Sequence, residues 1–323
     1  TFVVELESVA PYFLELTAFY VTYPVPRPVV ERHQGAWFRE GRIVGNGPFR
    51  MTAWRVNEKI RLERSPTYWG AADVSLRTID VLPHDNQTTA LNLYLTGAAD
   101  FLPGNFPGDL VDRLKTRPDF HSAPGMIVYF YRFNTTRPPF DDVRVRKALA
   151  KCVDRETIVR DLTRKGEMPT TTLVPGGVPD YESPENDLGF DPEAARRLLA
   201  EAGYGPGGKP VRRFTIVHNT HEQHKKIAEF VAEQWKRHLG IEAVAQNKEW
   251  QALLADVAKL EYDVQRAGWI GDYRDPKTFL DMWITGDGNN ETGWSDATYD
   301  RLVALASEAD RFAVSPPADV DAI

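Results

Sequence analysis

Cysteine is almost absent from this sequence: its 323 residues include one, Cys152. A single cysteine excludes an internal disulfide framework and leaves the redox compartment undetermined. Cys152 follows Val145, Ala148 and Leu149 at helical spacing, so it falls on the apolar stripe of an amphipathic helix. We therefore predict a buried, unreactive thiol rather than a nucleophile.

Long hydrophobic runs are missing too. No stretch of 18 or more apolar residues occurs, so the sequence predicts no membrane-spanning helix. It also contains no signal peptide and begins at Thr1 rather than at a methionine. We expect the chain to be a piece of a longer protein, and no targeting segment reveals its compartment.

The chain has no excess of positive charge. Its 39 Lys and Arg against 46 Asp and Glu give a net charge of -7. Nucleic-acid-binding proteins usually carry a basic face that neutralises phosphates. The balance therefore argues against a nucleic-acid partner.

Familiar catalytic and metal-binding motifs are also lacking. There is no Gly-x-Ser-x-Gly elbow, P-loop or dinucleotide fingerprint. His221 and His224 lie three residues apart, whereas the zinc-protease helix needs a spacing of four so that both face the metal. His218 ends a predicted strand, so it need not converge with them. We predict no metal site, no cofactor and no covalent chemistry.

The pattern that is present divides near residue 125. Before it, short strands dominate, at 59–64 and 79–82, with short helices at 88–95 and 108–114. After it, strands alternate with capped helices. Acidic residues open these helices and glycines close them: Asp141 or Asp142, Asp154, Asp191, Gly166, Gly203 and Gly240. This alternation predicts two lobes of mixed α/β structure.

The aromatic stretch 126–133 joins the two halves. It contains no glycine or proline, so it can form one continuous strand. Two interpretations remain open: a strand that crosses between lobes and serves as a hinge, or an ordinary buried strand of one sheet. A cleft between lobes would be the natural place for a ligand.

The segment 262–272 (YDVQRAGWIGD) combines unusual features. Gly268 allows another backbone to approach, Trp269 offers a flat apolar wall, and Asp272 places a carboxylate at the strand end. Such a strand could pair with an extended peptide while Asp272 holds the ammonium terminus. Taken alone, a buried core strand is the better interpretation.

Several longer motifs occur in one order along nearly the whole chain, from residue 1 to about 309. They are 46–49 (NGPF), 62–69 (LERSPTYW), 138–146 (PPFDDVRVR), 199–204 (LAEAGY), 249–250 (EW) and 266–273 (RAGWIGDY). Together they resemble the oligopeptide-binding proteins of peptide ABC importers, solute-binding proteins of family 5, including murein-peptide-binding relatives.

The resemblance implies a two-lobed, clam-like α/β binding-protein fold of type II with an extra domain. Residues 1–24 would be the end of that extra domain, 25–126 part of lobe I, and 127–323 most of lobe III. The N-terminal part and the C-terminal end of the family fold would be missing. The resemblance also implies a periplasmic protein, or one lipid-anchored on the outer face of the cytoplasmic membrane.

The resemblance further implies a ligand site. Asp272 would meet the peptide amino group, and Gly268, Trp269 and Ile270 would pair with its backbone. Trp250 and Trp269 would wall side-chain pockets, while Arg266 and His224 match positions at the carboxylate end. This chain departs from the family pattern where it has Arg132 instead of an acidic residue, and Val257 and Thr163 instead of cations. Arg132 could meet an extra ligand carboxylate, as in a cell-wall peptide.

The function these residues imply is capture of short peptides for delivery to an ABC permease, by a monomer without enzymatic activity. The alternatives are a murein peptide, a non-peptide cargo such as a chelated metal, haem or sugar, or a hydrolase on a similar scaffold.

Overall fold

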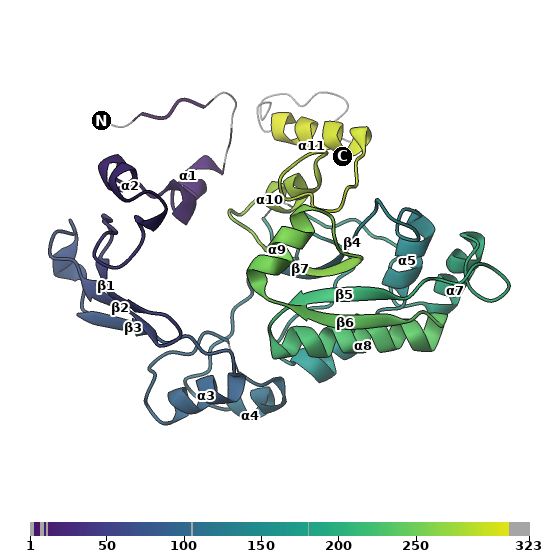
Figure 1. Ribbon diagram of the computed structural model, residues 1–323, viewed down its shortest axis with the longest axis horizontal. Helices are drawn as coiled ribbons and strands as arrows, with labels where there is room; N and C mark the ends of the chain where they lie inside the picture. Colours follow the sequence, from purple (N-terminus) through teal and green to yellow (C-terminus); the bar gives the residue numbers. More distant parts are fainter. Residues whose placement is uncertain (1–2, 7–9, 11, 105, 180, 310–323) are drawn as a thin grey trace. The chain divides into compact units, whose positions relative to one another are not determined.

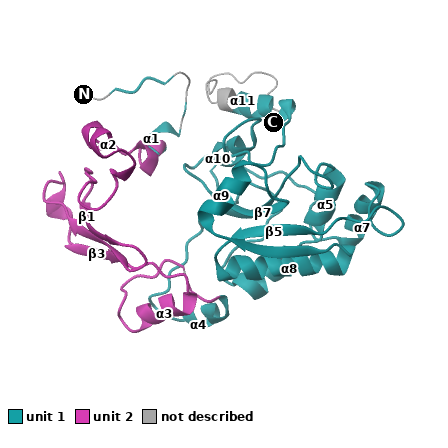
Figure 2. Cartoon of the chain, viewed as in Figure 1, with its two compact units in different colours: residues 1–15, 108–323 teal, residues 16–107 magenta. Residues whose placement is uncertain are grey.

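The computed structural model describes residues 3–6, 10, 12–104, 106–179 and 181–309. The chain divides into two compact units, one of residues 16–107 and one of residues 1–15 with 108–323 (Figure 2). The three-part division into 1–24, 25–126 and 127–323 stays a prediction.

The unit 16–107 is built on an antiparallel sheet in the order β1-β2-β3. Phe49 pairs with Arg64 and Ile60 with Val81, and a bidentate ion pair joins Arg61 to Asp80 across two strands. Its elements are η1 (Tyr20–Thr22), α2 (Arg27–His33), η2 (Gln34–Ala36), β1 (Phe49–Arg55), β2 (Lys59–Arg64), η3 (Ala71–Asp73), β3 (Thr78–Val81) and α3 (Gln87–Leu95); α1 (Phe13–Leu16) lies at the boundary of the units.

The larger unit holds a four-stranded sheet in the order β4-β7-β5-β6 (Figure 1). β4 and β7 are antiparallel, while β5 runs parallel to β6 and to β7. The strands are β4 (Ile127–Phe133), β5 (Phe214–Asn219), β6 (Ala243–Lys248) and β7 (Val264–Ile270). The helices are η4 (Gly108–Leu110), α4 (Val111–Leu114), α5 (Val143–Lys151), α6 (Arg155–Thr157), η5 (Ile158–Thr163), α7 (Pro192–Glu201), α8 (Glu222–Leu239), α9 (Trp250–Ala258), α10 (Lys277–Leu280), η6 (Asp281–Trp283) and α11 (Ala297–Ala309).

The predicted helix starts are confirmed by their caps. Asp142, Asp154 and Asp191 each accept a backbone N–H from the first turn of α5, α6 and α7. Gly240 ends α8 with a φ of 68°, a left-handed conformation that favours glycine. The helix expected to run from Asp154 to Gly166 ends earlier and is not regular. It changes to π-helix at η5 and ends at Arg164, whose φ is 58°.

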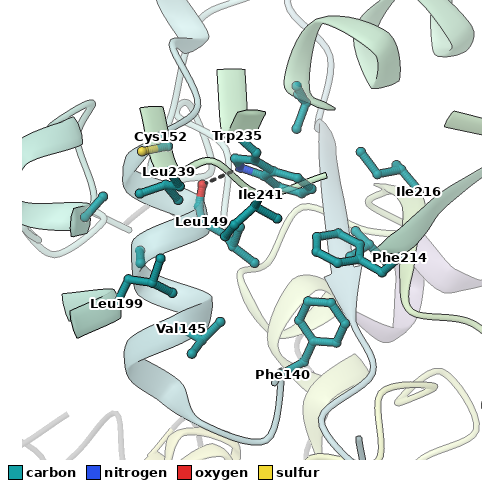
Figure 3. Close-up of a cluster of buried hydrophobic side chains, with 14 of the residues drawn as sticks. Phe140, Val145, Leu149, Cys152, Leu199, Phe214, Ile216, Trp235, Leu239 and Ile241 are labelled. Atoms are coloured by element: carbon teal, nitrogen blue, oxygen red, sulfur yellow. Dashed lines mark hydrogen bonds between the residues drawn. The ribbon is translucent and has the colours of Figure 1, made fainter. Parts of the chain in front are cut away.

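A single hydrophobic cluster fixes α5, α7 and α8 against the sheet (Figure 3). Trp235 of α8 is 1% exposed and donates its indole N–H to the Leu149 carbonyl at 2.9 Å. Phe140 and Phe214 meet edge to face with ring centroids 4.9 Å apart. Cys152 is fully buried in this cluster, as predicted, and burial raises the pKa of its thiol to about 12.

Strand β4 pairs with β7 along its entire length, from Ile127 with Ile270 to Phe133 with Val264. This pairing makes β4 an ordinary strand of one sheet and favours the second of the two interpretations of residues 126–133.

The helices of the described residues are all too short or too polar to span a bilayer.

Candidate functional site

One edge of β7 is unpaired over most of its length. β4 covers the other edge, but β5 pairs with β7 only at Val264 and Gln265. Gly271 donates its N–H to the Met126 carbonyl at 2.8 Å, so odd-numbered residues of β7 point their main-chain groups toward β4. The main-chain N–H and C=O groups of residues 266, 268 and 270 therefore point away from β4. In the described part of the larger unit no strand takes these hydrogen bonds.

Asp272 lies just past the end of this edge. Its main chain is fixed because its N–H donates to Thr278 Oγ1 at 3.1 Å, and the Trp269 indole donates to the same oxygen at 3.3 Å. Among the described residues no side chain forms an ion pair with the Asp272 carboxylate, and burial raises its pKa above the usual value. A partly buried carboxylate without a counter-charge is suited to a cationic ligand group.

Arg266 supplies positive charge toward the other end of the edge. Its guanidinium stacks 4.6 Å from the ring centroid of Tyr129, and its buried Nε has no hydrogen-bond partner among the described residues. One terminal nitrogen lies 3.5 Å from the position that a Cβ would take at Gly268. The guanidinium thus lies alongside Gly268, about four residues from Asp272.

His224 lies beside the same tyrosine. Its Nδ1 is 3.5 Å from the Tyr129 hydroxyl, and its ring packs against His221 with centroids 4.4 Å apart. Burial, followed by the charge of Arg266 and the two other histidines, lowers the pKa of His224 to about 3. The imidazole is therefore neutral at pH 7 and acts as a hydrogen-bonding group, not as a cation.

The remaining predicted residues divide between two faces of the sheet. Ile270 and Gly268 lie exposed on the side of Arg266, and Trp269 packs on the opposite face against Val128 and Phe279. Gly268 has little room for a side chain, because a Cβ there would lie 3.2 Å from the Val128 carbonyl oxygen. Trp250 opens α9 and is 48% exposed; no ring contact in the described structure joins it to Trp269.

Arg132 is not available as an unpaired cation. It is 7% exposed, forms a 2.5 Å ion pair with Glu291, and lies over the rings of Phe130 and Trp283. A ligand carboxylate would have to displace Glu291 to reach it. The assignment of Arg132 to the ligand site stays a prediction. Its side chain lies on the face opposite to Arg266, since the two residues occupy alternate positions in the β4–β7 register.

Two residues of this site were not predicted. Tyr129 lies directly across from Gly268 in the β4–β7 register, and Thr278 holds both Trp269 and Asp272. The alternation of residues 126–133 could have placed Tyr129 on the Arg266 face once the register was known. Thr278 carries no such signal, because only the turn at 271–276 brings it back to the strand.

His218 and His221 each use a ring nitrogen in a local contact with the main chain. The Nδ1 of His221 accepts the N–H of Gln223 as the cap of α8, and that of His218 lies 2.9 Å from the Asn219 carbonyl oxygen. In the described residues no group of three or more His, Cys, Asp or Glu could hold a metal ion.

The geometry therefore offers an unpaired strand edge between a carboxylate and a guanidinium. Four residues of extended chain span about 13 Å, since a strand rises by roughly 3.3 Å per residue. An extended molecule of that length, with a cationic and an anionic end, fits this edge in one direction only.

Comparison with known proteins places this arrangement in context. The model of bacterial extracellular solute-binding proteins, family 5 middle, matches residues 1–291. The oligopeptide-binding protein OppA of Bacillus subtilis is 34% identical over 314 residues, which cover 94% of this chain and 57% of that protein.

Two solved structures are similar in fold as well. The murein tripeptide binding protein MppA of Escherichia coli has a TM-score of 0.88 at 32% identity, covering 94% of this chain and 60% of that one. OppA of Haemophilus influenzae, in complex with the peptide RPPGFSPFR, has a TM-score of 0.87 at 30% identity, covering 95% and 61%. The chain thus spans less than two thirds of each relative. The predicted mixed α/β fold of these proteins is confirmed.

Proposed function

Because this chain belongs to the bacterial extracellular solute-binding proteins of family 5, we propose that it captures short peptides and delivers them to an ABC importer. The observation that carries the proposal is the unpaired edge of β7 between Asp272 and Arg266. Relatives whose names describe oligopeptide binding support it. The proposed location is the periplasm or the outer face of the cytoplasmic membrane.

The charges at the two ends set the direction of the peptide. Its ammonium group lies at Asp272 and its carboxylate at Arg266, so the peptide runs antiparallel to β7. Residues 266, 268 and 270 form the main-chain hydrogen bonds with the peptide. These bonds do not depend on the peptide's side chains. A span of about four residues favours peptides of three or four residues.

The protein acts in this proposal as a monomeric binding protein without chemistry of its own. Its partners are the peptide and a membrane permease. Family 5 is a family of solute-binding proteins, and this supports a binding role over the alternative of a hydrolase.

A cell-wall peptide is the second candidate ligand, favoured by the similarity to the murein tripeptide binding protein. Such a ligand carries more carboxylates than an ordinary tripeptide. The buried Arg132 is the cation that would meet one of them, after displacing Glu291.

Mass spectrometry of ligand released from protein purified without added peptide tests the proposal. We expect masses of peptides of three or four residues. Masses of muropeptides would favour the second candidate, and a uniform sugar or haem mass would contradict both.

A further inference from the structure

A short segment far from β7 in the sequence packs on the turn that follows Asp272. The ring of Tyr12 stacks on Tyr273 with centroids 4.0 Å apart and planes inclined by 11°. Glu15 Oε2 accepts the backbone N–H of Arg274 at 2.7 Å, and its Oε1 accepts the Arg274 guanidinium at 3.0 and 2.9 Å. All four residues belong to the same compact unit.

These contacts hold the two residues immediately after Asp272. On the other side, Thr278 holds the N–H of Asp272 itself. The main chain around the carboxylate is therefore fixed by two independent anchors, one of them supplied by residues 12–15. The position of Asp272 matters because its carboxylate has no ion-pair partner among the described residues to orient it.

The ion pair between Glu15 and Arg274 would add little by itself. The side chain of Arg274 is 70% exposed, and exposed ion pairs contribute little to stability. The bond from the Arg274 N–H to Glu15 is different, because it fixes the backbone of the turn. The Arg274 N–H and guanidinium both hold the pKa of Glu15 below its usual value, so Glu15 is ionised at neutral pH.

We propose that Tyr12 and Glu15 are positioning residues of the amine-end subsite: they hold the turn so that Asp272 meets the ammonium group of a peptide. The inference rests on the proposed function for its ligand and on the packing of residues 12–15 for its mechanism. Neither residue touches the peptide in this account. Both act through Asp272.

The variants Glu15→Ala and Glu15→Gln test this role, since glutamine keeps an oxygen that can accept the Arg274 N–H. The readout is the ratio of affinities for trialanine and N-acetyl-trialanine, measured by calorimetry on the purified chain. We expect Glu15→Ala to lower this ratio by roughly three- to tenfold, which is the size of effect seen when interacting neighbouring residues are changed. Glu15→Gln should retain most of the ratio. A general loss of stability would weaken both peptides alike and leave the ratio unchanged.

Glu31→Ala is the matched control, because it removes another exposed ion pair, with Arg27, in the unit 16–107. We expect it to leave the ratio as in the parent. Tyr12→Ala should lower the ratio, while Tyr12→Phe keeps the stacked ring and should not. An unchanged ratio in Glu15→Ala and Tyr12→Ala would overturn the proposal.

A second measurement separates this proposal from the proposed function. Hydrogen exchange of the Arg274 amide in ligand-free protein should become faster in Glu15→Ala and stay near the parental rate in Glu15→Gln. Faster exchange would support the anchoring of the turn even if trialanine fails to bind, which would count against the proposed function. Unchanged exchange would overturn the positioning role.

Discussion

Asp272 has a charge in a position that is unfavourable without a ligand. Burial raises its pKa, so the folded protein holds the proton more tightly than the unfolded chain does. This group's contribution to stability therefore falls as pH rises from the unfolded pKa through the higher folded one. At neutral pH the ionised carboxylate destabilises the ligand-free fold, and a bound ammonium group would reverse this effect.

Asp272→Asn should therefore stabilise the ligand-free protein. The substitution removes the partly buried charge and keeps the shape of the side chain. We expect a rise in Tm of about 1–2 °C at pH 7, because 1 kcal/mol corresponds to roughly 2–4 °C in a chain somewhat smaller than this one. The gain should shrink as pH falls to 3, below the ordinary pKa of an aspartate, because protonation of Asp272 removes the charge. Differential scanning calorimetry at both pH values measures this, and a lower Tm at pH 7 would contradict it.

Single residues of the site could be predicted only in part. The resemblance of the 266–273 motif implies Asp272 and Arg266, and the structure places them toward the two ends of the unpaired edge. Their roles in binding stay predictions. The ion pair of Arg132 with Glu291 could not be predicted, because 159 residues separate the partners and no periodicity links them. Glu15 was missed for the same reason, since 259 residues separate it from Arg274. Thr278 was missed because only the turn at 271–276 brings it back to the strand.

At the scale of elements, β7 is the strand whose unpaired edge is proposed to bind the peptide. Its main-chain groups point alternately toward β4 and toward the unpaired edge. The position of a substitution in β7 therefore decides which of the two edges loses a hydrogen bond. Ile270 is 67% exposed, and its N–H points to the unpaired edge. Proline is tolerated at strand edges where the missing N–H faces away from the sheet.

Ile270→Pro should weaken trialanine binding while leaving the fold intact. It removes one main-chain donor, which is worth about 1 kcal/mol, or roughly fivefold in affinity, relative to Ile270→Ala, which keeps that donor. Calorimetry on both variants gives the difference, and circular dichroism checks the fold. Equal affinities in the two would show that the ligand does not pair with this edge.

Helix starts were more predictable than strand ends. Aspartates before α5, α6 and α7 provide local capping signals that tertiary structure did not override. The strand expected at 79–82 lies instead at β3 (Thr78–Val81), because its bounds are set by pairing with β2 rather than by its own residues. The cap of α8 by His221 was missed, since histidine is an unusual capping residue.

At the scale of the molecule, the two compact units differ in their cores. In the larger unit the cluster around Trp235 buries side chains from α5, α7, α8 and the sheet. In the unit 16–107, the described residues include only two buried hydrophobic side chains, Ala90 and Leu91. No residue of β1, β2 or β3 is fully buried, whereas β5 has four. The amino-acid composition does not predict this difference in buried hydrophobic side chains, because it averages over both units.

Local stability should therefore differ between the units. Few buried apolar contacts mean that opening costs little free energy. We expect the amides of β1, β2 and β3 to exchange at least about tenfold faster than those of β5 and β7. Hydrogen exchange followed by mass spectrometry measures both sets in one sample. Equal protection in the two units would show that this chain buries the first sheet more fully than its described side chains indicate.

The central claim is that the β7 edge binds a peptide whose amino end meets Asp272. Calorimetry of trialanine and N-acetyl-trialanine, with the parent chain and with Asp272→Asn, tests it most directly. We predict that the parent binds the free amine about 100-fold more tightly, because the acetylated peptide leaves the partly buried Asp272 carboxylate unpaired. Asp272→Asn should abolish the preference. Equal affinity of the parent for both peptides, or a preference that survives in Asp272→Asn, would contradict it.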